Sequence, residues 1–397
     1  MSSCRWPRAR ELAARAVLPV PSRRVPLAQA GGAVLAADAT ARTDLPQTDT
    51  AAMDGWAVAG PPPWRVSGSV LAGGPPGPAL AAGKATEIAT GAVLPVGADG
   101  VLRREHGVPS REPGMSSRGL GMPDGDLLAP LDQRAAARVG ADVRRAGGEC
   151  VAGEVVLGAG SRLGPVALGL LAAAGHDAVE VRHPAVDLLV LGDELLGSGP
   201  ARDGRLRDAL GPMLTAWLPA LGLAIGSRRH VPDRAGALDL ALRGCLSDVV
   251  VTTGSTARGP VDHLHTALAA IGARLVVDGV AVRPGHPQLL AVLPDGRPLV
   301  GLPGNPLAAV SGLLTLLEPV AAALAGLAPA VGVFGALVED VAAGQDAHRL
   351  VPVRAGRPVL FAGPAMLRGL AVADHVAVIP PGGAPAGTEL ELLPLPH

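Results

Sequence analysis

Apolar residues between positions 184 and 328 recur in two alternating patterns, which makes this the most regular part of the chain. Continuous apolar runs typical of buried strands lie at 186–191, 223–227, 249–253, 275–282, 288–292 and 299–302. Apolar residues at helical spacing lie at 206–221, 235–246 and 261–271, and a further helix is expected to begin at Asn305. Strands that alternate with helices predict βαβ units and therefore a doubly wound α/β domain.

The flanking segments have shorter patterns. Helical spacing at 7–17 and 25–39 predicts two helices, and a third at 164–174 ends before Gly175, a residue typical of helix C-caps. Residues 45–142 hold apolar pieces separated by Gly- and Pro-rich turns, which predicts a small β domain. Within it, residues 109–126 lack periodicity and are expected to form a loop.

Four domains follow from these patterns. Segments 1–44 and 143–183 are expected to form one discontinuous N-terminal α+β domain, with the small β domain, 45–142, inserted between them. The doubly wound α/β domain covers 184–328, and short strands with Pro and Gly at their joints predict a C-terminal β barrel or sandwich at 329–397. The fold class is thus multidomain, α/β plus β.

The amino-acid composition argues against several classes of protein. The chain has 397 residues, of which 48% are hydrophobic and 17% charged, as in folded globular proteins. A net charge of −1 and an aromatic content of 2% argue against a nucleic-acid or membrane-surface partner. The three cysteines are too widely spaced for a zinc cluster or a disulfide framework. With no signal-peptide pattern and no long uninterrupted apolar run, a cytoplasmic protein is expected.

Glycine, hydroxyl and acidic residues follow three of the predicted strands. They are Asp193 and Glu194, Gly254 and Ser255, and Pro303, Gly304 and Asn305. Because the carboxyl ends of parallel strands share one edge of a sheet, these loops are expected to converge on one ligand-binding crevice. Gly-rich loops there can direct backbone N–H groups at an anion. The Asn-Pro pair also fits an ordinary capped helix.

Carboxylates and cations near this edge suggest metal and oxyanion binding. Asp193 and Glu194, together with Asp262 of the next loop, are candidate Mg²⁺ ligands, although acids after a strand also commonly cap a loop. Arg283 and His286 are candidate oxyanion ligands in a turn that is equally typical of a surface. Alternate helix positions do not face each other, so the His263 and His265 pair does not predict a zinc site.

Six motifs, taken together and in order, resemble the molybdopterin molybdenumtransferases, the MoeA family that includes the gephyrin E domain. They are AMDGWAV at 52–58, TGAVLPVGAD at 90–99, LGDEL at 191–195, TTGSTARGPVD at 252–262, VRPGHP at 282–287 and GLPGNP at 301–306. The resemblance extends to LAVADHVAVIPPG at 370–382 and so covers nearly the whole chain.

This resemblance implies insertion of molybdenum into adenylylated molybdopterin with release of AMP, using molybdate and a divalent cation such as Mg²⁺. It also implies an elongated homodimer, with other proteins of the molybdenum cofactor pathway as candidate partners. By motif position, the implied catalytic acids are Asp54, Glu149, Glu194, Asp233 and Asp262. The implied substrate-binding residues are Thr90, Arg144, Gly254, Ser255, Arg258, Arg283, His286, Pro303, Gly304, Asn305 and Arg349.

The chain also departs from the family pattern. Arg283 and His286 stand where the family has two lysines, and Gly369 stands where it has a serine. Arg258 is an insertion in the Gly-rich loop. Because arginine binds oxyanions bidentately, Arg283 or Arg258 could replace a missing lysine; alternatively, Arg258 blocks the pocket. Two hypotheses follow, an active molybdenumtransferase or a catalytically impaired pterin-binding or scaffold paralogue, and the choice between molybdate and tungstate stays open.

Overall fold

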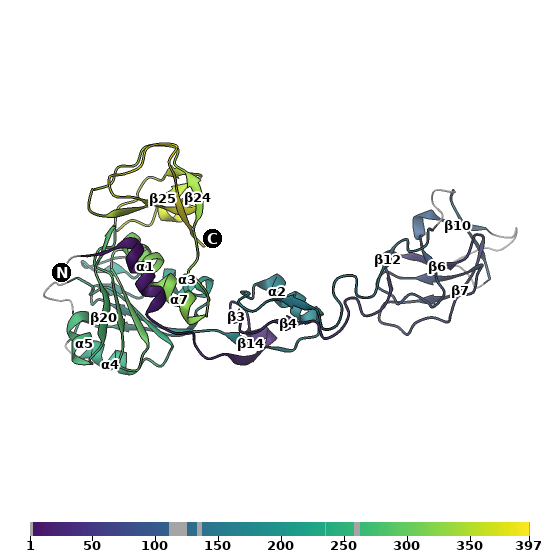
Figure 1. Cartoon of the computed structure of the whole chain (residues 1–397), viewed down its shortest axis with the longest axis horizontal. Helices are drawn as coiled ribbons and strands as arrows, with labels where there is room; N and C mark the ends of the chain where they lie inside the picture. Colours follow the sequence, from purple (N-terminus) through teal and green to yellow (C-terminus); the bar gives the residue numbers. More distant parts are fainter. Residues whose placement is uncertain (1–2, 111–124, 133–136, 235, 258–262, 397) are drawn as a thin grey trace. The chain divides into compact units, whose positions relative to one another are not determined.

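A computed structural model of the chain describes residues 3–110, 125–132, 137–234, 236–257 and 263–396. The chain divides into two units, which are described separately (Figure 1). The larger unit comprises residues 1–37, 158–168 and 178–397, and the smaller unit comprises 38–157 and 169–177. Arg258, Asp262 and most of the loop expected at 109–126 lie outside the described residues.

A six-stranded mixed sheet forms the centre of the larger unit, in the order β18–β15–β19–β23–β22–β20. The parallel strands are β18 (Ala224–Val231), β15 (Ala185–Leu191), β19 (Val249–Thr253) and β23 (Pro298–Leu302). Strand β22 (Leu289–Val292) pairs antiparallel both with β23 and with the edge strand β20 (Arg274–Asp278). The predicted alternation of strands and helices is confirmed, but the sheet is mixed because β22 and β23 form a hairpin.

Alternate residues of the strands pack into two cores, one on each face of this sheet. Val249 and Val251 belong to the core shared with α1, α3 and α7, whereas Val250 belongs to the core under α4 and α5 (Figure 1). Covering both faces explains why β19 reads as a continuous apolar run. The helices are α1 (Trp6–Arg15), α3 (Leu210–Trp217), α4 (Ala237–Arg243), α5 (Leu264–Ala270), α6 (Pro306–Gly312) and α7 (Glu318–Leu324).

The helical segment 306–324 is the central buried element of the first core. A π-helical turn, η4 (Leu313–Leu317), joins α6 to α7. The segment is long and apolar enough to cross a membrane, but 89% of its apolar window is buried inside the protein, as in a core helix. The Trp6 indole on α1 donates a hydrogen bond of 3.0 Å to Thr315, which fastens the first helix to this segment.

A second sheet of the larger unit combines C-terminal strands with two strands from earlier in the chain. Its order is β1 (Cys4–Arg5), β21 (Val280–Arg283), β25 (His348–Arg354), β27 (His375–Ile379), β28 (Glu389–Pro394) and β24 (Val333–Ala336), with β26 (Arg357–Pro358) beside β25. The apolar run 275–282 is therefore two strands in two different sheets. Gly279, with φ of +85°, makes the turn between them, a conformation that favours glycine.

The helix predicted at 25–39 is wrong. The segment forms β2 (Arg23–Pro26), the short 3₁₀ turn η1 (Leu27–Gln29) and β3 (Val34–Leu35), and both strands pair with β14 (Ala178–Arg182). Gly32 has φ of +79°, which ends any helix, and the apolar residues are buried by strand pairing instead. The helix expected at 206–221 begins only at Leu210.

Short elements complete the larger unit and its connection to the smaller one. Leu206 and Arg207 cannot extend helix α3 because they pair as a strand with residues 195–196. The helix predicted at 164–174 is confirmed as α2 (Pro165–Ala173). The remaining short elements are β16 (Leu195–Leu196), β17 (Leu206–Arg207), η3 (Leu218–Leu221) and η5 (Leu370–Val372).

The smaller unit contains a six-stranded sheet with a core on each face. Its order is β10 (Gly107–Ser110), β11 (Leu127–Pro130), β7 (Trp64–Val70), β8 (Lys84–Ile88), β6 (Gly55–Ala59) and β9 (Gly100–Arg103). A Cβ on Gly55 would overlap the carbonyl oxygen of Leu102, so strand β6 requires a glycine here. The other elements are β4 (Ala39–Thr40), β5 (Thr50–Ala51), η2 (Arg104–His106), β12 (Val143–Arg144) and β13 (Val155–Leu157).

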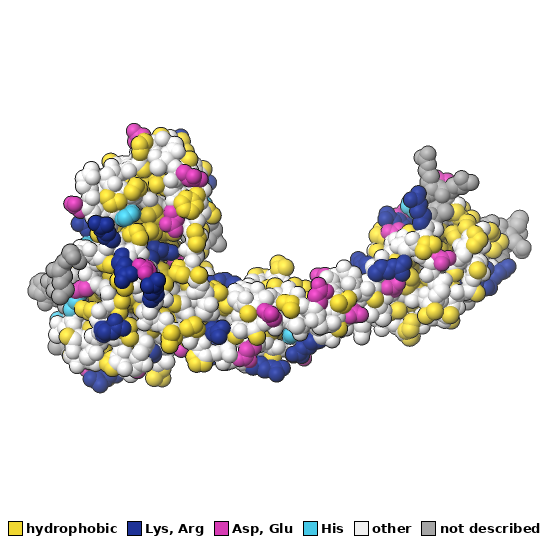
Figure 2. Space-filling view, viewed as in Figure 1, with side chains coloured by type: hydrophobic (Ala, Val, Ile, Leu, Met, Phe, Trp, Pro, Cys, Tyr) yellow, Lys and Arg dark blue, Asp and Glu magenta, His cyan; other side chains and the backbone are white. Residues whose placement is uncertain are grey.

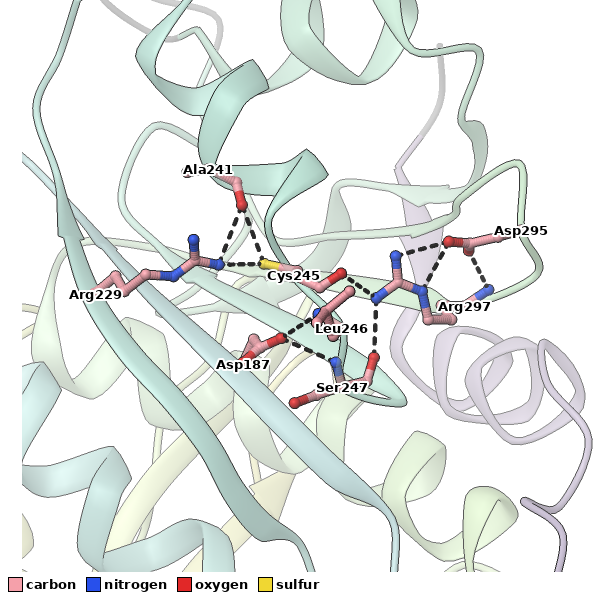
Figure 3. Close-up of polar contacts among 8 residues, drawn as sticks. All are labelled: Asp187, Arg229, Ala241, Cys245, Leu246, Ser247, Asp295 and Arg297. Atoms are coloured by element: carbon pink, nitrogen blue, oxygen red, sulfur yellow. Dashed lines mark hydrogen bonds and ion pairs between the residues drawn. The ribbon is translucent and has the colours of Figure 1, made fainter.

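Buried Asp187 organises a polar network near the amino ends of the parallel strands (Figure 3). Its carboxylate accepts hydrogen bonds from the N–H groups of Leu246 at 2.9 Å and Ser247 at 3.0 Å, and from the Ser227 hydroxyl at 2.5 Å. Burial raises the pKa of Asp187, but these hydrogen bonds outweigh burial and hold the pKa below its ordinary value. The loop before β19 is therefore fixed to β15 by one carboxylate.

Two arginines extend this network to the neighbouring elements. Arg297 donates to the carbonyl oxygens of Cys245 at 2.8 Å and Ser247 at 3.0 Å, and it pairs with Asp295. Arg229 donates to the Cys245 sulfur at 2.9 Å (Figure 3). The network thus joins β18, α4 and the β22–β23 hairpin at the edge opposite the carboxyl ends of the parallel strands.

The face drawn in Figure 2 carries charged side chains of both signs. On α1, exposed Glu11 lies 2.6 Å from Arg8 and 2.9 Å from Arg15. Exposed pairs of this kind contribute little to stability because water and salt screen them.

Candidate functional site

Three loops that follow adjacent parallel strands meet at one pocket of the larger unit. Strands β15, β19 and β23 are neighbours in the sheet and run parallel, so their carboxyl ends share an edge. Glu194, Gly254 and Gly304, one from each following loop, line a pocket of about 400 Å³. The strand order itself brings these residues together.

The loop after β19 has a backbone that glycine makes possible. Gly254 has φ of +84° and its N–H donates to the Leu302 carbonyl at 2.9 Å, which joins two of the three loops. A Cβ on Gly254 would lie 3.3 Å from the Leu191 oxygen. Ser255 also has a positive φ, 51°, which is strained for a residue with a side chain. Such strain is commonly found at binding sites.

The predicted acids of the α/β domain differ in their hydrogen bonding. The Glu194 carboxylate lines the pocket and accepts no hydrogen bond from the described residues, and its side chain folds over Gly192. Asp193 and Asp233 instead face each other, because each carboxylate accepts the other residue's N–H, at 3.2 and 3.3 Å. Asp193 and Asp233 therefore cap the loops after β15 and β18, while Glu194 is the acid of these three that lines the pocket.

The helix start after β23 differs from the expected anion site. Asn305 is the N-cap in an extended conformation, and Pro306 is the first helical residue, as predicted. However, the N–H groups of Leu307 and Ala308 donate to the carbonyl oxygen of Pro364, at 2.9 and 3.4 Å. These donors are already used. The Asn305 side chain makes no capping hydrogen bond and lines the pocket.

The predicted cations of the VRPGHP motif lie elsewhere. His286 lines a separate pocket of about 430 Å³ together with Thr256 and His265, and its Nδ1 lies 2.8 Å from the Val280 carbonyl oxygen. Arg283 is on β21, in register with Arg349 on β25. The Arg349 guanidinium donates to the Ala342 carbonyl at 2.7 Å. None of these three side chains lines the Glu194 pocket.

The smaller unit brings two of the expected residues into contact. The Asp54 carboxylate accepts hydrogen bonds from the N–H and the hydroxyl of Thr90, at 2.7 and 2.8 Å. These bonds hold the pKa of Asp54 below its ordinary value. Arg144 lies on β12 opposite Thr50, and Glu149 is exposed in the following turn. Asp54 and Thr90 thus form one polar pair.

Comparison with known proteins agrees with this architecture. A family described as the MoeA N-terminal region (domain I and II) matches residues 5–175, and one described as a probable molybdopterin binding domain matches 187–323. A molybdopterin molybdenumtransferase of Synechococcus elongatus is 33% identical over 327 residues, which cover 78% of this chain and 77% of the relative. The chain belongs to the molybdopterin molybdenumtransferase family.

Further members of the molybdenumtransferase family, and two solved structures, are also similar to this chain. A molybdopterin molybdenumtransferase of Staphylococcus aureus strain MSSA476 is 28% identical, covering 76% of this chain and 71% of the relative. A molybdopterin biosynthesis MoeA structure from Pyrococcus horikoshii is 25% identical, covers 100% of both chains and has a TM-score of 0.71. A second MoeA structure, from Pyrococcus horikoshii OT3, shares the fold with a TM-score of 0.72. It is 22% identical and covers 99% of this chain and 100% of its own.

The described part of the pocket offers one carboxylate of the kind that can hold a divalent cation. Mg²⁺ is usually held by one or two carboxylates together with phosphates and waters. Glu194 offers such a carboxylate, whereas Asp193 is directed to Asp233. Within the described ranges, no group of three His, Cys, Asp or Glu side chains could hold a metal alone. Asp262, the third expected ligand, lies outside those ranges.

A cation of the pocket was not identified from the sequence. Arg207, at the end of β17, lines the pocket together with Glu194 and the buried Asp208. One of its guanidinium nitrogens donates to the Leu196 carbonyl at 2.9 Å. Asp208 is fully engaged, accepting from Gly211 N–H at 2.8 Å and pairing with Arg228. Arg207 is therefore a positive charge that lines the pocket and that no sequence motif indicated.

Proposed function

We propose that this protein transfers molybdenum from molybdate to adenylylated molybdopterin, with release of AMP, in molybdenum cofactor biosynthesis. The observation that supports this function best is the pocket of about 400 Å³ lined by Glu194, Arg207, Gly254 and Gly304. It lies at the carboxyl edge of the parallel strands, where α/β folds bind ligands, and the chain belongs to the molybdenumtransferase family.

The chemistry of the pocket suits an adenylylated substrate. Cleavage of a phosphoanhydride bond leaves negative charge on the departing AMP, and a positioned cation lowers the energy of that charge. A divalent cation bound at Glu194 would supply charge neutralisation for the phosphates. Arg207 supplies a permanent positive charge from the protein, and the glycine loops allow close approach of the backbone.

Roles are also proposed for residues outside this pocket. Asp54 and Thr90 are proposed to contact substrate as a hydrogen-bonded pair, because the N–H and hydroxyl of Thr90 fix the position of the Asp54 carboxylate. We further propose, from the family, that the chain forms a homodimer. Sedimentation of the purified protein measures that assembly directly.

The proposed reaction is tested with the purified full chain, adenylylated molybdopterin, Mg²⁺ and molybdate. Release of AMP that depends on molybdate is the expected result, and the gene is expected to restore molybdoenzyme activity in a strain that lacks the transferase. Binding of the substrate without release of AMP, together with failure to complement, would show that the chain is a pterin-binding or scaffold paralogue instead. The position of His286 in a separate pocket is the observation that favours this second function.

Replacing Arg207 by Gln is expected to raise the KM for adenylylated molybdopterin by about tenfold, because it removes one charge-assisted hydrogen bond that contributes roughly 1.5 kcal/mol. Steady-state AMP release measures it. Arg205→Gln is the matched control, because Arg205 lies two residues away, donates to the Leu195 carbonyl at 2.9 Å and does not line the pocket. Equal KM values for the two variants would show that Arg207 does not bind the substrate.

A further inference from the structure

A second pocket of the larger unit shares no residue with the Glu194 pocket. It has a volume of about 330 Å³ and lies where α1, α7, η3 and the end of β28 meet. Its walls are mainly apolar and include Trp217, Leu221, Leu314, Ala322, Leu393 and Leu395. A cavity of this size is at the lower end of the range for small-molecule sites, roughly 300–1,000 Å³.

Two of the three charged residues of this pocket neutralise each other. Arg10 and Glu318 form an ion pair of 2.9 Å in which both side chains are almost buried, at 12% and 13% exposure. Arg10 also donates to the carbonyl oxygens of Leu314 and Ala330, and Glu318 accepts the Ala330 N–H at 2.8 Å. Both groups therefore have their hydrogen bonds within the protein and leave no net charge.

The third charged residue, Arg162, has a guanidinium without a partner among the described residues. It lies against the backbone of Gly222, where a Cβ would overlap the guanidinium nitrogen Nη1. Burial lowers the pKa of Arg162, and the attraction of Glu318 opposes that effect only in part. The Arg162 residue as a whole is exposed to solvent and lines the pocket. The pocket thus combines apolar walls with one uncompensated positive charge.

We propose that this pocket binds a small organic monoanion with an apolar body, its anionic group at Arg162 and its body against Trp217 and Leu314. A single free guanidinium matches a single carboxylate or sulfonate, which it can bind bidentately. A neutral apolar molecule would leave the charge unpaired, and a multiply charged nucleotide would meet the carboxylate of Glu318 and apolar walls. The site is independent of the proposed transferase function.

The proposal is tested by calorimetric titration of the full chain with 2-naphthoate, and with the uncharged 2-naphthalenemethanol. Wild-type protein is expected to bind naphthoate with a Kd below about 1 mM, and the uncharged compound at least about tenfold more weakly. Arg162→Gln should weaken naphthoate binding by about tenfold and leave the uncharged compound unaffected, while Arg162→Lys should retain part of the affinity.

Two further variants make the outcome decisive. Ala220→Leu fills the pocket from an exposed position while leaving Arg162 intact, and it should abolish binding even if Arg162 variants fold poorly. Arg243→Gln, on the exposed face of α4, should bind as wild type does. Absence of saturable naphthoate binding to the wild type, or affinity unchanged by both Arg162→Gln and Ala220→Leu, would overturn the proposal.

Discussion

Replacement of Glu194 by Gln is expected to reduce molybdate-dependent release of AMP by about 100-fold or more, because charge neutralisation by a carboxylate-held cation supplies several kcal/mol to such a reaction. Glu194 lines the pocket and accepts no hydrogen bond from the described residues, whereas Asp208, the other acid of the pocket, pairs with Arg228. Gln has nearly the same shape but no charge, so the loss should appear in turnover rather than in folding. AMP release over a series of Mg²⁺ concentrations measures it.

The neighbouring acid provides the control for this result. Asp193→Asn changes a carboxylate that accepts the N–H of Asp233 at 3.3 Å, and an amide oxygen can accept the same hydrogen bond. We expect Asp193→Asn to keep most of the activity. A tenfold change in rate corresponds to roughly 1.4 kcal/mol of activation free energy. If Glu194→Gln released AMP within about threefold of the wild-type rate, the change would be smaller than this, and Glu194 would have no role in the reaction.

Replacement of Asp187 by Ala is expected to lower the free energy of unfolding of the larger unit by about 3 kcal/mol, since it leaves several buried donors without an acceptor. Asp187 is 4% exposed and accepts hydrogen bonds from Leu246 and Ser247 (Figure 3) and from Ser227. Urea unfolding at pH 7 measures the change. Glu11→Ala, which removes exposed pairs on α1, should leave the unfolding free energy nearly unchanged.

This stabilisation depends on pH in a direction set by the lowered pKa of Asp187. A carboxyl group whose folded pKa lies below its unfolded value stabilises the protein fully above the unfolded pKa, about 3.9, and progressively less as the pH falls through the folded pKa. The difference between wild type and Asp187→Ala should therefore be constant from pH 7 to about 5 and shrink below about 4. A difference that grew on acidification would contradict the assigned network.

Several parts of the site could be predicted from local sequence. Strand β19 is a run of β-branched residues that is followed by Gly254, so both its buried position and the glycine loop after it can be predicted from the sequence. Strands β15 before Glu194 and β23 before Gly304 are likewise mainly apolar and are followed by loops that contain glycine. Parallel neighbours must place these ends together, which explains the pocket. The six ordered motifs were sufficient to identify the family.

Other features depend on contacts between distant residues. Arg207 joins the pocket because residues 206–207 pair with 195–196 as a short strand, which helical spacing alone does not indicate. His286 was expected near Glu194, yet the turn at Gly279 and the bond to Val280 place it in a different pocket. Segment 25–39 has helical spacing but is held as strands by β14.

The sequence alone determined the family, the α/β alternation and the identity of the three loops, because strand patterns and glycine positions are local properties. Only the tertiary structure decided which charges share a pocket. Among the described residues, Glu194 has no hydrogen-bond partner while Asp193 is used as a cap, and Arg162 has no acidic partner in contact while Arg10 is neutralised by Glu318. Pairing of charges depends on residues that are far apart in the chain, and spacing along the sequence does not encode those distances.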